Sequence, residues 1–132
     1  MYQLSLLSGF VMLLFSFWQN PDLEESKLRG KTIYDEFCVT CHRADGTGFG
    51  KMYPPLAKSD FLSKNREASI RAVKYGMSGE IMVNGIKYSK KMAPLGLTDE
   101  EVKDVMNYVF TSWGNKVEKP VTLQEVSFIK KD

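Results

Sequence analysis

The sequence predicts an all-α domain of three to four helices, joined by long loops and one short β-hairpin. Apolar residues recur at helical spacing in three segments, and a stretch rich in Gly and Pro separates the first two. An Asn84-Gly85 pair interrupts a short alternating segment, which is typical of a hairpin. The length of 132 residues corresponds to one domain, and the chain contains no internal repeat.

The first helix is expected over Glu24–Phe37, with Asp22 as its N-terminal cap. A loop from Asp45 to Pro55 follows, because its glycines and prolines oppose regular structure. The second helix is expected from about Asn65 to Tyr75, with Gly76 ending it. This part of the chain is therefore predicted to form two helices separated by a long loop.

The remaining elements are a hairpin and a final helix. Residues Ile81–Tyr88 alternate around their central turn and predict two short antiparallel strands. The last helix follows Thr98, which forms a capping-box pattern with Glu101, and Gly114 is expected to end it. The sequence indicates no element for Asn115–Asp132.

Composition excludes several classes of protein. With 43% hydrophobic and 26% charged residues, the chain is neither disordered throughout nor a polytopic membrane protein. Its 18 Lys and Arg against 16 Asp and Glu give a net charge of only +2, so charge provides no argument for nucleic-acid binding. The chain has only 2 Cys and 1 His, and they stand together.

The first twenty residues differ from the rest. Leu4–Trp18 is almost continuously apolar, and no charge precedes Asp22, which predicts export. The segment lacks an N-terminal Lys or Arg, and Leu14 and Ser16 only approximate a cleavage site. Two outcomes therefore stay open. Residues 1–20 are a cleaved signal peptide of a soluble periplasmic protein, which we favour, or an uncleaved anchor that holds the domain on the periplasmic side of a membrane.

Candidate chemistry is concentrated in Cys38-Val-Thr-Cys41-His42. On a helical turn, the two thiols share one face and the imidazole lies next to the second thiol. This arrangement suits a flat porphyrin, whose two vinyl groups take up the thiols while the imidazole meets the iron. Cys-x-x-Cys-His is the attachment pattern of a c-type haem. Export agrees with it, because bacterial haem attachment takes place outside the cytoplasm.

Three rival interpretations apply to the same residues. A structural zinc site needs four ligands, and the chain has no further Cys or His. A thioredoxin-like dithiol belongs beside a strand of a βαβ unit, whereas here the motif follows a predicted helix. A plain structural disulfide between Cys38 and Cys41 is the third alternative. Haem attachment explains the whole pattern, including the His.

From Leu23 to Asn115 the chain resembles a class I c-type cytochrome, the small monohaem fold of cytochrome c. The resemblance rests on an ordered set of features: Gly30 and Tyr34 before the motif, Asp45-Gly-Thr-Gly48 and Pro54-Pro-Leu56 after it, and Met92-Ala-Pro through Tyr108 to Ser112-Trp113-Gly114. It implies that Gly30 and Tyr34 let the first helix cross the last, with Tyr108 or Phe110 as their partner. It also implies that the Pro54 carbonyl accepts a hydrogen bond from the His42 ring. The domain is expected to span residues 21–115, with 116–132 as a C-terminal extension.

The second axial ligand of the iron is expected to be a methionine. No second His exists, and a thioether is the remaining strong ligand. Position in the chain leaves Met77, Met82 and Met92 open, and the resemblance favours Met92, although Ala93 separates it from the Pro that usually follows directly. An open or water-bound iron is the further alternative. Four residues are candidate partners of the haem propionates, with a purely structural role in the core as the alternative for the aromatic ones: Tyr53, Asn84, Tyr88 and Trp113.

The expected function is electron transfer by one covalent haem c, without enzymatic activity of its own. The resemblance implies redox partners such as oxidoreductase or oxidase complexes, and the hairpin resembles cytochrome domains that are subunits of larger oxidoreductases. No nucleic acid is expected as a partner, and membrane association would come through the N-terminal segment. Two other functions stay open, a haem-based enzyme or ligand sensor with a labile sixth ligand, and a haem-free thiol–disulfide protein. Five lysines flank the loops around the haem edge, either to steer an acidic partner or only to aid solubility: Lys51, Lys58, Lys87, Lys90 and Lys91.

Overall fold

The computed structural model describes residues 21–117 and 119–132, and the predicted signal peptide or anchor lies outside these residues. The elements follow in the order α1 (Pro21–Phe37), α2 (Val39–His42), α3 (Asp60–Lys64), α4 (Arg66–Tyr75), β1 (Ile81–Val83), β2 (Ile86–Tyr88), α5 (Asp99–Thr111) and α6 (Leu123–Phe128). Helices predominate, and the strands form one antiparallel hairpin, as the sequence predicts. Within the described residues, no helix is both long and apolar enough to span a bilayer.

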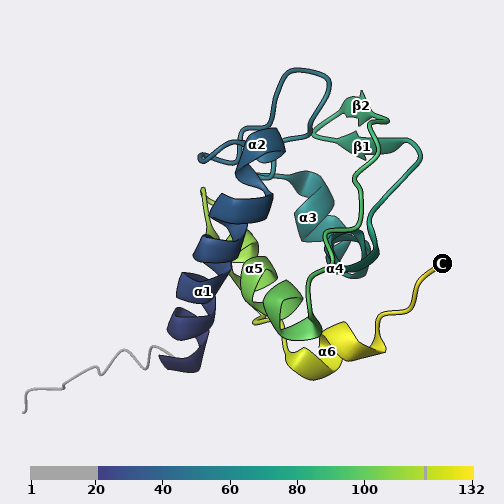
Figure 1. The fold of residues 1–132 in the computed structure, drawn as a ribbon. Coiled ribbons are helices and arrows are strands. Elements are labelled where there is room, and N and C mark those ends of the chain that lie inside the picture. The colour runs from purple at the N-terminus through teal and green to yellow at the C-terminus, as the bar shows by residue number, and fades with distance from the viewer. Residues whose placement is uncertain (1–20, 118) are drawn as a thin grey trace, which may run out of the picture.

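Helices α1 and α5 cross beside each other, while α2 and the hairpin lie at the end of the molecule opposite α6 (Figure 1). The crossing depends on Gly30, because a Cβ added there would lie 2.0 Å from the backbone oxygen of Asp104. Next to this contact, the buried Tyr34 ring packs on Tyr108 and Trp113, with centroid separations of 5.4 and 4.9 Å. The predicted crossing and its partner Tyr108 are therefore confirmed.

A buried polar cluster ties the same two helices together. The Asp104 carboxylate accepts hydrogen bonds from Ser26 Oγ at 2.6 Å and from Arg29 Nε at 2.6 Å. Asn107 Nδ2 donates to Ser26 Oγ at 3.0 Å and to the backbone oxygen of Val121 at 3.1 Å. The cluster thus links α1, α5 and the segment leading to α6.

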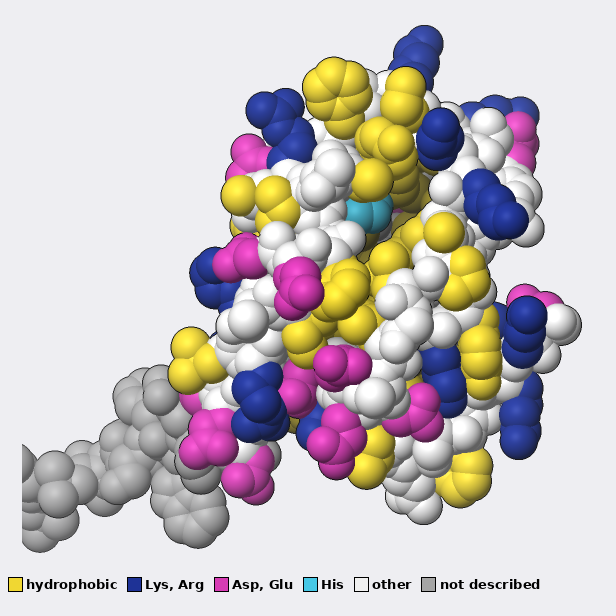
Figure 2. All heavy atoms as spheres, in the orientation of Figure 1, with side chains coloured by type: hydrophobic (Ala, Val, Ile, Leu, Met, Phe, Trp, Pro, Cys, Tyr) yellow, Lys and Arg dark blue, Asp and Glu magenta, His cyan; other side chains and the backbone are white. Residues whose placement is uncertain are grey.

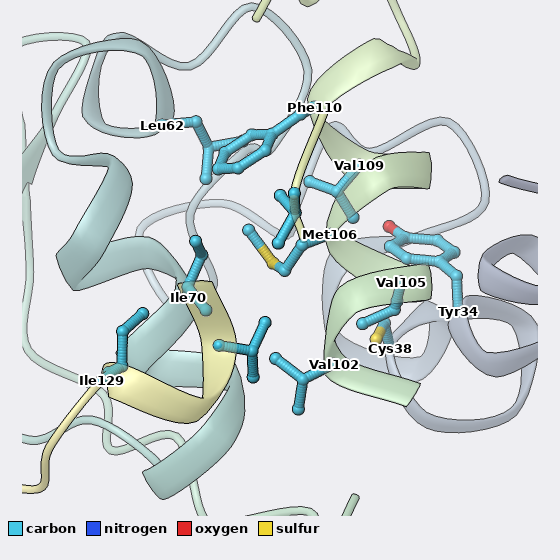
Figure 3. Packing of buried hydrophobic residues seen from close by; sticks show 12 residues of the cluster. Tyr34, Cys38, Leu62, Ile70, Val102, Val105, Met106, Val109, Phe110 and Ile129 are labelled. Atoms are coloured by element: carbon cyan, nitrogen blue, oxygen red, sulfur yellow. The ribbon is translucent and has the colours of Figure 1, made fainter. Parts of the chain in front are cut away.

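The apolar core lies between α5, α4 and α6. Figure 3 shows Met106 near its centre, with Ile70 of α4 on one side and Val105 of α5 on the other. The segment for which the sequence indicates no element contributes to this core through Val126 and Ile129. Val126 and Ile129 therefore pack in the same core as α4 and α5.

The segment around α6 is held by hydrogen bonds as well as by apolar contacts. Arg66 donates to both carboxylate oxygens of Glu125, at 2.6 and 2.9 Å. Lys74 Nζ donates to the backbone oxygen of Val126 at 2.8 Å, and Tyr75 Oη donates to that of Ile129 at 3.1 Å. These contacts fix α4 against the C-terminal segment, which matters because α4 leads directly into one wall of the candidate site.

Predicted element boundaries differ in detail. Helix α1 starts at Pro21, a residue that is favoured in the first turn, rather than at Glu24. Helix α5 begins after Thr98 with a complete capping box, as predicted, but it ends at Thr111 before Gly114. The short helices α3 and α6 were not predicted, because they are too brief to show a helical period.

Candidate haem crevice

The Cys-x-x-Cys-His segment forms a tight turn at the end of α1. Cys38 follows the last residue of α1, and its backbone oxygen accepts hydrogen bonds from the Cys41 and His42 amides at 3.2 and 2.9 Å. Both thiols are free, Cys38 being 8% exposed and Cys41 half-buried. Burial raises the pKa of the Cys38 thiol to about 11, so this thiol stays protonated at neutral pH. The turn therefore presents two reduced sulfurs and one imidazole together.

The His42 ring is held in one orientation. Its Nδ1 lies 3.0 Å from the backbone oxygen of Pro54, as the resemblance implies. Because a carbonyl oxygen only accepts, Nδ1 carries the proton and donates it to this bond. Burial also lowers the pKa of His42, although the bond to Pro54 opposes this effect. A neutral imidazole with Nδ1 occupied leaves the lone pair of Nε2 available to a metal.

The loop that carries Pro54 is itself fixed by backbone hydrogen bonds. The Phe49 amide donates to the Tyr53 oxygen at 2.9 Å, and the Tyr53 amide donates to the Phe49 oxygen at 3.2 Å. Beyond the prolines, the Leu56 amide donates to the Gly46 oxygen at 2.7 Å. The acceptor for the imidazole is thus held by structure on both sides of it.

An apolar crevice opens in front of the imidazole. Figure 2 shows the single His side chain at the bottom of a hollow surrounded by hydrophobic side chains. Two adjoining cavities make up the crevice, and they share six lining residues: Cys38, His42, Pro54, Met77, Ile81 and Met92. The inner cavity continues to Val105 and Met106 of α5, and the outer one reaches Cys41 and Tyr88. The turn, the loop after α4, the hairpin and α5 therefore surround one space.

The predicted ligand candidates are placed differently by the fold. Met92 and Met77 both line the crevice, whereas Met82 is 53% exposed on the hairpin and lines neither cavity. Met77 and Met92 are also backbone partners: each amide donates to the other's oxygen, at 2.8 and 2.9 Å. Sequence reasoning did not find this pairing, because the two residues belong to separate segments and no local pattern joins them.

Residues considered for the propionates have identifiable contacts. Trp113 Nε1 donates to the backbone oxygen of Ala44 at 3.1 Å, and Asn84 exchanges two hydrogen bonds with Asp60, at 2.9 and 2.7 Å. Tyr53 and Tyr88 line the outer cavity. Sequence reasoning missed Ile81 as a lining residue, although the hairpin alternation contains this information, since exposed Met82 stands between Ile81 and buried Val83.

The rival interpretations lack support in this geometry. Among the described residues, no group of three or more His, Cys, Asp or Glu side chains is gathered as a metal site. The described part of the chain forms one two-stranded antiparallel sheet, so the thiols do not lie beside a strand of a βαβ unit. In contrast, two thiols, an imidazole with a free nitrogen and a thioether around an apolar crevice are the donor set that fits a covalently bound haem.

Comparison with known proteins agrees with this fit. The family model of cytochrome c matches residues 28–113. The chain is 38% identical over 110 residues to cytochrome c-552 of Thermus thermophilus, an alignment that covers 76% of this chain and 83% of that protein. It is 30% identical over 105 residues to the cytochrome c subunit of the quinone alcohol dehydrogenase of Gluconacetobacter polyoxogenes, covering 76% of this chain and 22% of that subunit.

A third relative is the cytochrome c subunit of gluconate 2-dehydrogenase of Pantoea cypripedii, with 26% identity over 119 residues, covering 87% of this chain and 26% of that subunit. The family match includes the Cys-x-x-Cys-His turn and all of the residues that line the crevice. Members of this family carry a covalently bound haem c with its iron. The chain therefore belongs to the cytochrome c family and is a c-type haem protein that transfers electrons.

Proposed function

We propose that this chain attaches one haem through Cys38 and Cys41 and holds its iron between His42 and Met92. The observation that carries the proposal is that His42 and Met92, although distant in the sequence, line the same apolar crevice as the two thiols. The fixed imidazole, with its Nδ1 bonded to Pro54, supports His42 as one ligand. The exposure of Met82 outside the crevice supports Met92 over that residue.

When bound, the haem supplies a one-electron iron couple, and a His/Met ligand pair raises the reduction potential of such a couple. The chain contributes the rest. Pro54 prevents the imidazole from rotating, and the apolar side chains around the crevice exclude water. With His42 and Met92 both engaged, the chain offers no open position to a substrate. We therefore infer that it carries electrons and catalyses no reaction itself.

The partner is inferred to be an oxidoreductase or oxidase complex, met outside the cytoplasm. The dehydrogenase cytochrome subunits among the relatives support this class of partner. Lys51, Lys90 and Lys91 line one surface hollow, and the two latter residues also line the outer part of the crevice. Positive charge at this place would guide a partner with an acidic surface, and a small, brief interface suits electron exchange.

The ligand assignment is tested with protein matured in a host that attaches haem. Met92→Ala should abolish the thioether–iron absorbance of the oxidised protein, lower the reduction potential and allow the ferrous protein to bind carbon monoxide. Met77→Ala and Met82→Ala are the matched controls and should retain the absorbance. If Met77→Ala loses it and Met92→Ala keeps it, the ligand is Met77. Release of the haem by acid-acetone extraction would contradict covalent attachment.

A further inference from the structure

Gly76 lies where α4 ends and the wall of the crevice begins. Its φ is +80°, and its amide donates to the Ala72 backbone oxygen at 2.9 Å. A Cβ added to Gly76 would lie 2.7 Å from the backbone oxygen of Met92 and 2.9 Å from both the nitrogen and the Cδ of Pro94. These are backbone and ring atoms, which cannot turn aside as a flexible side chain does. The end of α4 thus approaches the Met92 loop as closely as a residue without a side chain allows.

The Met92 backbone oxygen, with which such a Cβ would clash, is already engaged in a hydrogen bond. The Met92 oxygen accepts the hydrogen bond of the Met77 amide at 2.8 Å, and the Met92 amide returns a bond of 2.9 Å to the Met77 oxygen. This reciprocal pair places the Met92 backbone relative to the end of α4. A side chain at position 76 would push the two segments apart at the atom that joins them.

Helix α4 is not free to move away instead. Ile70 is fully buried in the core, and Lys74 pairs with Asp99 at 3.0 Å and donates to the Val126 oxygen. Asp99 opens α5 just beyond the Met92 loop, so the loop is held at both of its ends. Any displacement caused at position 76 is therefore absorbed by the loop that carries Met92.

We propose that Gly76 is a positioning residue for the sixth iron ligand: its missing side chain sets the depth at which Met92 enters the crevice. The inference rests on the proposed ligation by Met92. Gly76 acts through the paired backbones of Met77 and Met92. A larger residue would leave the fold in place but would favour the state in which the thioether has left the iron.

The test compares haem-loaded Gly76→Ala with Gly96→Ala. Gly96 lies in the loop that carries Met92. It also has a positive φ, +72°, and a Cβ added there meets nothing within 4 Å, so both substitutions place Ala at a positive φ and only the first creates the clash. Imidazole titrated into the oxidised protein competes with the thioether. Because apparent affinity follows the population of the open state, Gly76→Ala should bind imidazole about tenfold more tightly than wild type, and Gly96→Ala within about twofold of it.

The thioether–iron absorbance should also weaken in Gly76→Ala at temperatures where circular dichroism still reports a folded chain. Equal imidazole affinities for the two glycine variants, while Met92→Ala abolishes the absorbance, would overturn the role of Gly76 and leave the ligand assignment intact. An absorbance that survives Met92→Ala would overturn both.

If Gly76→Ala yields no mature protein, amide hydrogen exchange of the wild type provides the second measurement. Imidazole should increase exchange at both Met77 and Met92, because displacement of the thioether opens their backbone pair. Protection of both amides that imidazole leaves unchanged would contradict the proposal.

Discussion

Pro54 contributes one backbone oxygen to the site, and this atom determines which nitrogen of His42 is left for a metal. Sequence reasoning identifies Cys38, Cys41 and His42 because their chemistry depends on contiguous residues, and resemblance adds Pro54. The contacts that surround Met77 and Met92 could not be predicted. They are a through-space backbone pair and the close approach of Gly76, neither of which leaves a local pattern in the sequence.

The Asp104 carboxylate is expected to stabilise the fold in a way that depends on pH. Burial by itself raises the pKa of Asp104, but the hydrogen bonds from Arg29 and Ser26, together with the positive charges of Lys103 and Arg29, outweigh burial and leave the pKa below its usual value. A lowered pKa in the folded state stabilises the protein above the unfolded pKa, and this contribution is lost as the pH falls through the folded value. Asp104→Asn should therefore lower the free energy of unfolding by about 1–3 kcal/mol at neutral pH.

The difference between Asp104→Asn and wild type should shrink as the pH falls below about 4, the ordinary pKa of an Asp, and through the lower pKa of folded Asp104, where its carboxylate becomes protonated. Denaturant unfolding at neutral and acid pH, followed by circular dichroism, measures it. Asp35→Asn is the control, because the exposed Asp35 makes only a surface pair with Lys31. An equal loss for the two variants, or a loss independent of pH, would show that the buried pairing is unimportant.

Among the helices, the longer ones and the one with a recognisable capping box could be located from the sequence. Helices α1, α4 and α5 span several turns and show their apolar period, so the sequence was sufficient to locate them. Helices α3 and α6 last one or two turns and depend on tertiary contacts, such as the ion pair between Arg66 and Glu125. A usable sign of α6 was present, since Thr122 caps it by accepting from the Glu125 amide, a spacing that also occurs at Thr98.

The close crossing of α1 and α5 is expected to depend on the missing side chain of Gly30. Gly30→Ala should destabilise the haem protein by at least about 2 kcal/mol, because overpacking of a close contact costs this much and the struck atom is backbone. Thr32→Ala, on the exposed face of the same helix, should change stability by no more than about 0.5 kcal/mol. Thermal and denaturant unfolding of both variants make the comparison. A Gly30→Ala protein as stable as wild type would mean that the helices separate at little cost.

For the molecule as a whole, the crevice cuts into the same core that holds the helices together. Cys38 and Val105 line it and also belong to the buried cluster. A domain of this size buries only a small apolar core, so the loss of part of it lowers stability noticeably. The bound cofactor and the folded chain are therefore expected to depend on each other, with electron exchange restricted to the mouth of the crevice.

The location of the whole molecule in the cell is a separate prediction. The apolar segment Leu4–Trp18 is expected to direct export and then to be removed, which leaves a soluble periplasmic protein. Cell fractionation combined with the intact mass of the haem protein measures this outcome. A mass that includes residues 1–18, found in the membrane fraction, would instead establish a tethered electron carrier.

Val126 and Ile129 pack into the core, so the core is complete only when these C-terminal residues are in place. The expected export signal is at the N-terminus, so Cys38, Cys41 and His42 are expected to leave the cytoplasm before these core residues. Until the residues of α6 arrive, α4 lacks the partners of Lys74 and Tyr75, and the wall of the crevice that follows α4 has no fixed support. We therefore expect the thiols to be accessible to an attaching enzyme on an open chain, and the crevice to close around the cofactor once the last helix has docked.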